Sequence, residues 1–337
     1  MVEKYVVILG AGRGSRMESR DPNHSKVAYP ILGKPLINYV IDACKAIKPK
    51  EIYTVVGYGG KHTEECVKNH SKVVWQKEIL GTGHALKQVK ELADKEGDVI
   101  VVGGDTPLLT SATLNKVYHK HHKNGNVLTI CTSVLENPTG YGRILRERGS
   151  YRLLEIREDK DCNEEEAEIN EVNAGIYIIN NKLLQEYLPK LSTNNAKHEY
   201  YLSELVKLFR EQGLPVEAYV LEDAQDIFCV SDRTQLAYAA KVIRKRVNKQ
   251  LMLSGVSIED PDTAYISPEA VVGRDTVIMP NTTLLGKCKV GEGCYIGPNT
   301  TLIDVKVGND AHVKLCYLEK MTVKDGEHVG PYFTNRK

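Results

Sequence analysis

Several features that mark special classes of protein are missing from this chain of 337 residues. The formal net charge is only +1, so no global field draws the protein to nucleic acid or to an anionic membrane surface. No apolar run is long enough to span a bilayer. The first four residues lead straight into a predicted strand and leave no room for a signal peptide. We therefore expect a cytoplasmic protein that binds neither nucleic acid nor membrane.

The eight cysteines include no C-x-x-C pair. Without a secretory signal, they are expected to be reduced and mostly buried thiols. Cys288 and Cys294 lie six residues apart, and a six-residue repeat explains that spacing better than a metal site does.

A glycine-rich segment, residues 9–17, follows the first predicted strand and holds three glycines. Glycine lets backbone N–H groups approach an anion closely, because no Cβ intervenes. Arg16 and Lys26 add positive charge at the same place. The combination indicates a polyphosphate ligand rather than a neutral one, although a simple turn remains the alternative.

The dinucleotide-binding fingerprint G-x-G-x-x-G does not fit this segment. Its third glycine comes one residue early. The second predicted strand, residues 52–56, also ends in Gly57 rather than in the acidic residue that would hold a ribose.

Short apolar strands alternate with amphipathic helices from residue 1 to about 225, for example a strand at 99–102 after a helix near 85–93. This alternation predicts an α/β domain with a mainly parallel sheet. Ligands bind outside the carboxyl ends of such strands. The glycine-rich segment and the sequence Gly103-Gly104-Asp105 both stand at such an end.

The period of the sequence then changes to six. After a helix predicted over 232–253, whose basic residues favour a solvated face over nucleic-acid binding, aliphatic residues recur every six positions. This hexapeptide repeat predicts a β-helix, a one-dimensional stack of coils. The repeating residues are Ile266, Val272, Ile278, Leu284, Val290, Ile296 and Leu302. We expect a catalytic domain at 1–228, a linker helix at 229–254 and a β-helix at 255–337.

Taken together, the motifs resemble the bacterial N-acetylglucosamine-1-phosphate uridyltransferase family over nearly the whole chain. Single motifs are common to many sugar nucleotidyltransferases, but the full series in this order is specific. Besides the glycine-rich segment and the hexapeptide tail, the motifs are Lys26, Gln76, Leu80 to Ala85, Gly103 to Asp105, Thr139 to Ile144, Ile156 to Asp161, Glu171 to Ile176 and Glu199 to Tyr201.

The resemblance implies an α/β nucleotidyltransferase followed by a left-handed parallel β-helix, which trimerises in this family. It implies that UTP and N-acetylglucosamine 1-phosphate give UDP-N-acetylglucosamine and pyrophosphate, with Mg²⁺ as cofactor. The sugar phosphate attacks the α-phosphorus in line, so catalysis consists of positioning and charge neutralisation.

The resemblance also assigns roles residue by residue. Arg16, Lys26 and Asp105 are the expected catalytic residues. Asp105 is also an expected Mg²⁺ ligand, with capping of the following helix as the alternative. Gln76 is expected to read the uracil edge by a paired hydrogen bond, and His84 to brace the loop beside it. The remaining expected substrate contacts are Leu9, Ala11, Gly12, Gly81, Thr82, Gly103, Gly104, Gly142, Glu158, Asn173, Glu199, Tyr200 and Tyr201.

The chain departs from the family pattern at three places. Ser231 stands where the second metal ligand is usually an asparagine, so Ser231 is expected to bind the metal, directly or through water, or Asp232 to contribute instead. Arg157 replaces a small apolar residue and leaves the identity of the sugar undecided. The chain also ends where an acetyltransferase site would begin, and we expect no acetyltransferase activity. Two alternatives remain: the same chemistry on glucose 1-phosphate or dTTP, and a catalytically weak nucleotide-sugar-binding subunit.

Overall fold

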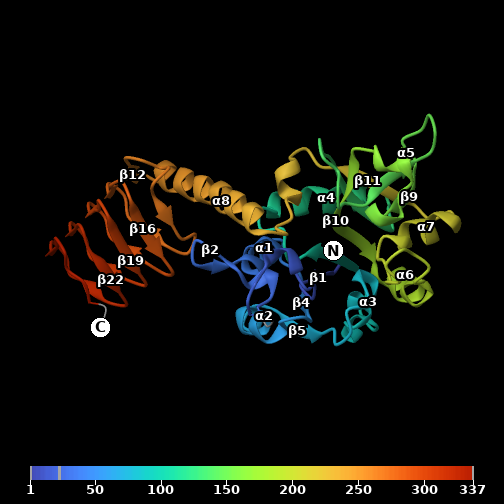
Figure 1. Cartoon of the computed structure of the whole chain (residues 1–337), viewed down its shortest axis with the longest axis horizontal. Coiled ribbons are helices and arrows are strands. Elements are labelled where there is room, and N and C mark those ends of the chain that lie inside the picture. Colours follow the sequence, from blue (N-terminus) through green and yellow to red (C-terminus); the bar gives the residue numbers. More distant parts are fainter. Residues whose placement is uncertain (1, 22–23, 336–337) are drawn as a thin grey trace. The chain divides into compact units, whose positions relative to one another are not determined.

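Figure 1 shows the computed structural model of the chain, which describes residues 2–21 and 24–335. The chain divides into two compact units. The first unit comprises residues 1–29 and 35–233, and the second comprises residues 30–34 and 234–337.

The first unit is built on a nine-stranded sheet with the order β11-β7-β10-β6-β1-β4-β5, to which β8 and β9 are joined through β10. β1 pairs in parallel with β4 and β6, and only β10 and the β8–β9 hairpin run antiparallel to their neighbours, so the mainly parallel sheet is confirmed. The strands are β1 (Lys4–Leu9), β4 (Glu51–Val56), β5 (Lys72–Trp75), β6 (Asp98–Gly103), β7 (Leu128–Val134), β8 (Arg143–Arg146), β9 (Leu153–Arg157), β10 (Glu171–Asn180) and β11 (Val216–Val220).

Helices cover both faces of this sheet, which explains why its central strands are continuous apolar runs. In β1, Tyr5 and Val7 belong to the core on one face, whereas Val6 and Ile8 belong to the core on the other. The α-helices are α1 (Leu36–Ala46), α2 (Gly60–Val67), α3 (Thr82–Lys87), α4 (Ser111–Lys123), α5 (Glu164–Ala167), α6 (Asn181–Tyr187) and α7 (Glu204–Glu211).

Short 3₁₀ turns and one small hairpin complete the elements between these strands and helices. The turns are η1 (Ser15–Met17), η2 (Lys26–Ala28), η3 (Lys90–Leu92), η4 (Asp159–Asp161), η5 (Leu188–Lys190) and η6 (Ala224–Ile227), and the hairpin pairs β2 (Pro30–Ile31) with β3 (Lys34–Pro35). The single helix expected near 85–93 is therefore wrong in detail, since α3 ends at Lys87 and η3 follows it.

The long helix α8 (Arg233–Leu253) leads into the coils of the second unit (Figure 1). Its buried Asn248 donates from Nδ2 to the carbonyl oxygens of Pro261 and Ala264, at 2.9 and 3.1 Å. Arg244 pairs with Asp262 at 2.8 Å. The helix is thereby fastened to the loop that opens the first coil.

The coils form three parallel sheets, as the hexapeptide period predicts. Partner residues on successive coils, such as Ile266 and Leu284, lie in register, and each repeating aliphatic side chain is buried inside the coil. The thiols of Cys288 and Cys294 are buried there too and donate to backbone carbonyls, so the repeat accounts for their spacing. The strands are β12 (Ser257–Ile258), β13 (Tyr265–Ile266), β14 (Val271–Val272), β15 (Val277–Ile278), β16 (Thr282–Leu285), β17 (Lys289–Val290), β18 (Tyr295–Ile296), β19 (Thr300–Ile303), β20 (Lys306–Val307), β21 (His312–Val313), β22 (Tyr317–Glu319), β23 (Thr322–Val323) and β24 (His328–Val329).

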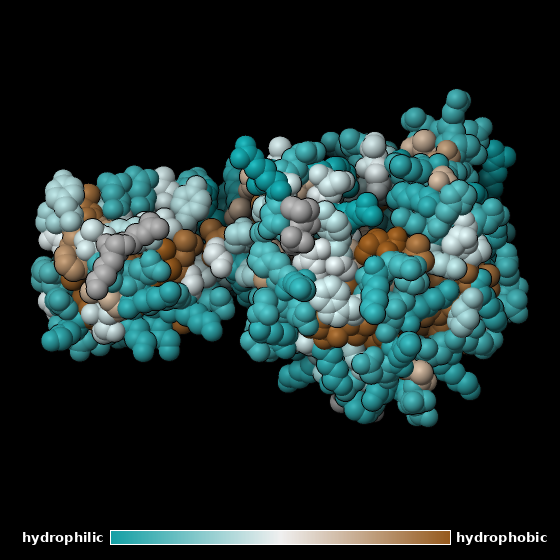
Figure 2. Space-filling view, turned by 60° about the horizontal axis from the view of Figure 1, so that its bottom comes forward, coloured by the Kyte–Doolittle hydropathy of each residue, from teal (hydrophilic) through white to brown (hydrophobic). Residues whose placement is uncertain are grey.

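This arrangement agrees with the expected left-handed parallel β-helix. The space-filling view shows hydrophobic and hydrophilic side chains mixed over both units (Figure 2). Within the described part of the chain, no helix combines the length and the apolar character needed to cross a membrane.

Candidate active site

The glycine-rich segment lies at the carboxyl end of β1, where close packing requires residues without a side chain. The Gly10 N–H donates to the Val55 carbonyl at 2.9 Å, and the Gly104 N–H donates to the Leu9 carbonyl at 2.8 Å. A Cβ on Gly104 would lie 3.1 Å from that carbonyl oxygen of Leu9. The ends of β1, β4 and β6 are thereby drawn together, and Leu9 stands directly beside Gly103 in the sheet.

Beyond Gly10 the segment opens toward solvent. Gly12 is exposed and a Cβ there would meet nothing within 4 Å, while Ala11 is buried. Gly14 has a φ of 60°, and a Cβ on it would lie 2.5 Å from the Cβ of Lys26. Gly14 therefore lets the segment pass directly over Lys26. Arg16 is exposed on the turn that follows.

Lys26 and Asp105 form an ion pair at the carboxyl edge of the sheet. Their side chains are mostly buried, with relative exposures of 13% and 22%. Burial by itself raises the pKa of Asp105, but the Lys26 ammonium and hydrogen bonds hold that pKa below its usual value. Burial likewise lowers the pKa of Lys26, but the Asp105 charge more than reverses this effect. At neutral pH both groups are charged.

The segment 229–231 lies directly against Asp105. The Val230 N–H donates to the Asp105 carbonyl at 2.8 Å. The Cys229 thiol donates to Oδ2 of Asp105 at 3.0 Å and lies 3.6 Å from Oγ of the buried Ser231. Burial, followed by the neighbouring Asp105 charge, raises the pKa of Cys229 to about 12, so its thiol keeps its proton and acts as a donor.

Asp105 does not cap the helix that follows it. The N-cap of α4 is Thr110, whose side chain accepts from the Thr113 N–H at 3.2 Å. The hydroxyl of Thr106 donates to the Gly103 carbonyl instead. The capping alternative for Asp105 is therefore wrong, and its carboxylate faces Lys26 and Cys229.

Gln76 follows β5 directly and is 2% exposed. Its Nε2 donates to the Gly81 carbonyl at 3.1 Å and contacts Nδ1 of His84 at 3.0 Å. Gln88 contacts the other ring nitrogen of His84 at 3.2 Å. His84 thus braces this loop, as expected.

The loop around Gly81 is fastened to the segment 199–202. The Tyr200 N–H donates to the Leu80 carbonyl, and the Gly83 N–H donates to the Tyr200 carbonyl, both at 2.8 Å. Thr82 accepts from the Leu202 N–H at 2.9 Å. A Cβ on Gly81 would lie 2.6 Å from the Tyr200 carbonyl oxygen. The residues expected at the base and those expected at the acyl group of the sugar therefore share one backbone assembly.

Three of the expected sugar contacts lie near one another around the β8–β9 hairpin and β10. Glu158 accepts from the Ser203 hydroxyl at 2.7 Å, and its carboxylate lies 3.4 Å from the position of a Cβ on Gly142. The Asn173 N–H donates to the Gly142 carbonyl at 2.8 Å. The Asn173 side chain donates to the Tyr177 hydroxyl at 2.6 Å.

The hydroxyl of Tyr201 is buried and interacts with the Asp161 carboxylate. Burial, and then the charge of Asp161, raises the pKa of Tyr201. Glu199 adds to the same negative field. Tyr201 and Asp161 thus form a polar cluster with the nearby carboxylates of Glu158 and Glu199.

Arg157 does not point a free charge toward these residues. Its guanidinium pairs with Glu155 at 2.7 Å and with Glu166 at 3.5 Å, and its side chain is 37% exposed. The positive charge of Arg157, which left the identity of the sugar undecided at the level of sequence, is thus balanced by two glutamates of the protein.

The chain is similar in sequence to known proteins over almost its whole length. A protein named "Bifunctional protein GlmU" from Caldanaerobacter subterraneus subsp. tengcongensis is 41% identical over 332 residues, or 98% of this chain and 72% of that protein. The chain belongs to the GlmU family. Proteins of the same name from Enterococcus faecalis and Carboxydothermus hydrogenoformans are 40% and 42% identical, each over 72% of its own length and 98% and 97% of this chain.

One domain family matches within the α/β unit, and another matches within the β-helix. Residues 6–164 match the MobA-like NTP transferase domain, and residues 269–304 match six bacterial transferase hexapeptide repeats. Together with GlmU family membership, the first match supports sugar-1-phosphate uridylyltransferase activity on N-acetylglucosamine 1-phosphate. The chain is a nucleotidyltransferase.

GlmU-like nucleotidyltransferases generally use a divalent metal. Within the described residues, no three His, Cys, Asp or Glu side chains gather as a metal site. A hard cation such as Mg²⁺ needs only one or two protein oxygens, with phosphate and water completing its shell. The ionised Asp105, with Ser231 close by on the other side of Cys229, fits such a cation.

Three residues next to the expected GlmU-family site were absent from the predictions. Cys229 contacts Asp105, Ser203 contacts Glu158, and Asp161 lies beside Tyr201. Asp161 ends the motif Ile156 to Asp161, and Cys229 lies two residues before Ser231, so nearness to these positions was the signal in the sequence. Ser203 lies two residues after the motif Glu199 to Tyr201, but only the fold brings it to Glu158.

Proposed function

We propose that this site transfers the uridylyl group of UTP to N-acetylglucosamine 1-phosphate with Asp105 and Lys26 at its centre. The observation that carries the proposal is their mostly buried ion pair, which stands at the carboxyl edge of the sheet beside the glycine-rich segment. A buried charged pair at a ligand-binding edge is costly unless it has a task there. Family membership supports the same reaction.

The glycine-rich segment would hold the triphosphate. Its exposed backbone at Gly12 and the nearby Arg16 offer N–H donors and positive charge to the phosphates. Lys26 would neutralise the charge that develops as the phosphate oxygen of the sugar attacks the α-phosphorus and the bond to pyrophosphate breaks. No covalent enzyme intermediate is needed, because one in-line displacement completes the transfer.

Mg²⁺ would be held by Asp105, with Ser231 or Asp232 contributing directly or through water. When bound, the cation supplies positive charge that stabilises the phosphates in the transition state. Lys26 and Cys229 would keep the Asp105 carboxylate oriented for that role, since both contact its Oδ2 atom.

Gln76 would contact the uracil edge, with Gly81 and Thr82 beside the base. Its amide donates one hydrogen to the Gly81 carbonyl, and its carbonyl oxygen would accept from the uracil N–H. In the paired hydrogen bond that the sequence predicts, the second amide hydrogen would donate to a uracil carbonyl. Leu9, Gly103 and Gly104 shape the edge of the sheet around the nucleotide.

The sugar would bind between the β8–β9 hairpin and the segment 199–201. Gly142, Glu158 and Asn173 would contact its hydroxyl groups, while Glu199, Tyr200 and Tyr201 would enclose the acyl end. The polar groups of Tyr201 and Asp161, which lie together here, support polar recognition at this end. The internal pairing of Arg157 favours an uncharged sugar ring over a charged one.

A direct assay tests this function. Pyrophosphate release is measured with Mg²⁺ and UTP, offering N-acetylglucosamine 1-phosphate and glucose 1-phosphate in separate reactions. We expect release to favour the acetylated sugar strongly. Preference for glucose 1-phosphate would overturn the sugar assignment. Absence of release from folded protein that still binds UTP would favour a nucleotide-sugar-binding subunit.

The hexapeptide repeats support oligomerisation, and we propose a homotrimer formed through the β-helix of the second unit. Sedimentation equilibrium tests it, since the expected mass is three times the 37.6 kDa of one chain. The proposed compartment is the cytoplasm, by family membership. The lack of acetyltransferase activity stays a prediction.

A further inference from the structure

β10 is irregular at the point where it enters the expected sugar site. Asn173 and Tyr177 are four residues apart on this strand, but their partners on β7 are only two residues apart. The two extra residues of β10 form a β-bulge. The bulge includes Gly175, whose φ of 71° lies in the left-handed region where other residues are strained.

The bulge brings two side chains of the same strand into contact. In a regular strand, residues four positions apart are separated by about 13 Å. Here the Asn173 side chain donates from Nδ2 to the Tyr177 hydroxyl at 2.6 Å. Within the bulge, the Gly175 N–H donates to Oδ1 of Asn173 at 3.0 Å. Both ends of the Asn173 amide therefore have a partner on their own strand.

These two contacts determine which way the Asn173 amide faces. A backbone N–H can only donate, so the amide atom beside Gly175 is the oxygen and the atom beside Tyr177 is the nitrogen. Among the residues that the structure describes, the second Nδ2 hydrogen has no acceptor. Asn173 is only half-buried, which leaves this hydrogen for a ligand.

The Tyr177 hydroxyl is a fixed partner for this amide. Tyr177 is 5% exposed, and its ring belongs to the same core as Ile144 and Ile156 of the β8–β9 hairpin. Burial, and then the charge of Glu158, raises the pKa of Tyr177, so its hydroxyl keeps its proton. A neutral hydroxyl on a buried ring offers the Asn173 amide an acceptor that neither moves nor changes charge.

A fixed amide favours binding, because a mobile one would have to be ordered at a cost in affinity. We propose that the Tyr177 hydroxyl is a positioning group for the sugar, which holds the Asn173 amide so that its free hydrogen donates to a sugar oxygen. This role rests on the proposed function, in which Asn173 contacts the sugar. Tyr177 acts through Asn173 and needs no contact with the sugar itself.

Calorimetric titration tests this role without turnover. With Mg²⁺ present, the Kd values of UDP-N-acetylglucosamine and of UDP are measured for the full chain and for Tyr177→Phe. This variant loses one oxygen atom and keeps the buried ring. We expect the Kd of UDP-N-acetylglucosamine to rise about 3- to 10-fold, the size of one neutral hydrogen bond, and the Kd of UDP to stay unchanged.

A double-mutant cycle tests whether the hydroxyl acts through the amide. Asn173→Ala alone should also raise the Kd of UDP-N-acetylglucosamine. In that background, Tyr177→Phe should change this Kd by less than about twofold, because no amide is left to position. Equal effects of Tyr177→Phe in the two backgrounds would overturn the proposal.

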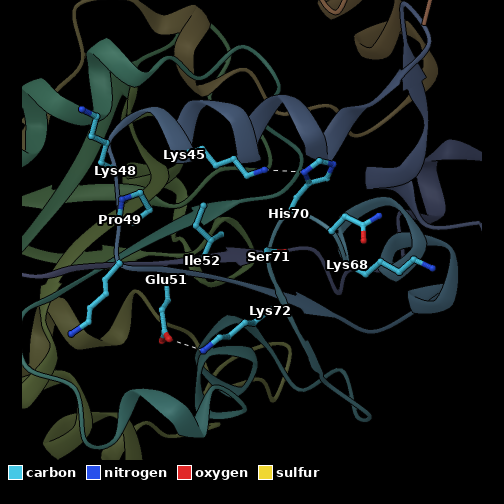
Figure 3. Close-up of a pocket in the computed structure, with 11 residues that line it drawn as sticks. Lys45, Lys48, Pro49, Glu51, Ile52, Lys68, His70, Ser71 and Lys72 are labelled. Atoms are coloured by element: carbon cyan, nitrogen blue, oxygen red, sulfur yellow. Dashed lines mark hydrogen bonds and ion pairs between the residues drawn. The ribbon is translucent and has the colours of Figure 1, made fainter. Parts of the chain in front are cut away.

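Tyr53→Phe is the matched control, because Tyr53 is another core tyrosine whose hydroxyl donates to a side chain. Its partner is Glu51, at the amino end of β4. Glu51 also pairs there with Lys72 at 2.6 Å, in the lining of a cavity rich in lysines (Figure 3). The control should leave both Kd values unchanged.

An unchanged Kd of UDP-N-acetylglucosamine in Tyr177→Phe would overturn the proposal. Equal weakening of both ligands would also overturn it, because this result would indicate a general change of the fold. Absence of pyrophosphate release from parent protein that binds UDP-N-acetylglucosamine would contradict the proposed function alone, since these affinities do not depend on turnover.

Discussion

The two units of this protein differ in how far apart in the chain their contacting residues are. In the β-helix, Asn281 contacts Asn299, 18 residues away, and partner residues on successive coils are 18, 17 or 16 residues apart. In the first unit, Lys26 meets Asp105 across 79 residues, and Asp105 meets Cys229 across 124. A repeat can be extended by counting, whereas a site assembled from distant segments depends on the whole sheet. The regularly spaced residues of the β-helix stabilise the fold, whereas the distant residues that meet in the first unit belong to the candidate active site.

The largest effect on activity should come from Asp105→Asn. The amide removes the charge that attracts the metal and leaves the ammonium of Lys26 without its partner. We expect kcat to fall about 10²- to 10³-fold, as for the loss of one preorganised electrostatic group. The measurement is pyrophosphate release, at a temperature where circular dichroism shows both proteins folded. A rate within about twofold of the parent would show that Asp105 is not part of the chemistry.

The β-helix should respond in the opposite way, by losing stability and keeping activity. Leu284 is fully buried and stacks between Ile266 and Leu302. Leu284→Ala should cost about 2–5 kcal/mol of the free energy of unfolding, through lost burial and the cavity that remains. Thr283→Ala, at the next position of β16 where the side chain is only half-buried, is the matched control.

The chain's one tryptophan makes this second prediction specific to one unit. Trp75 lies in β5 of the first unit, so its fluorescence follows that unit alone, whereas far-ultraviolet circular dichroism follows both. We expect Leu284→Ala to lower the denaturation midpoint seen by circular dichroism more than the midpoint seen by fluorescence. Equal shifts of both midpoints would mean that the two units unfold together.

A moderate effect is expected where a neutral side chain supports the charged pair. Cys229→Ala removes the thiol that donates to Oδ2 of Asp105. A thiol is a weak donor, so we expect the half-saturating Mg²⁺ concentration to rise only about 3- to 10-fold, with kcat at saturating Mg²⁺ near the parent value. Cys229→Ser should restore the parent behaviour, and Cys66→Ala in α2 should not change it. A loss of kcat without a change in Mg²⁺ dependence would contradict this role.

The smallest effect concerns Glu158 and depends on pH. Burial raises the pKa of Glu158, and the hydrogen bond from Ser203 only partly opposes this. The pKa of Glu158 is higher in the folded protein than in the unfolded chain, so ionised Glu158 opposes folding. The resulting loss of stability develops as the pH rises from the unfolded pKa through the folded pKa. Glu158→Gln removes this loss. Its melting temperature should therefore exceed that of the parent at about pH 8, but not at about pH 4.

The control for this prediction is Glu165→Gln, an exposed position on α5. Its effect on the melting temperature should be the same at both pH values. A gain for Glu158→Gln of equal size at the two pH values would indicate a packing effect rather than a titration.

The regular parts of this protein could be predicted from the sequence. The apolar run before Gly10 predicts β1, and the six-residue period predicts the inward residues from Ile266 to Leu302, because local spacing alone decides which side chains a strand or a coil buries. The position of Asp105 after a buried strand predicts its place at the carboxyl edge of a parallel sheet. Even there the sequence left a capping role open for Asp105, since it does not show which of several polar residues will cap α4.

Only the tertiary structure brought distant side chains into contact. It joined Cys229 to Asp105, Ser203 to Glu158 and Arg157 to Glu166, and it gathered lysines from α1, from β5 and from the segments that follow α1 and α2 around one cavity. Such contacts depend on strand order and loop course, across 124 residues for Cys229 and Asp105 and across 45 for Ser203 and Glu158. A sequence contains no local period for them, and for this reason the partner of each charge became visible only in the folded chain.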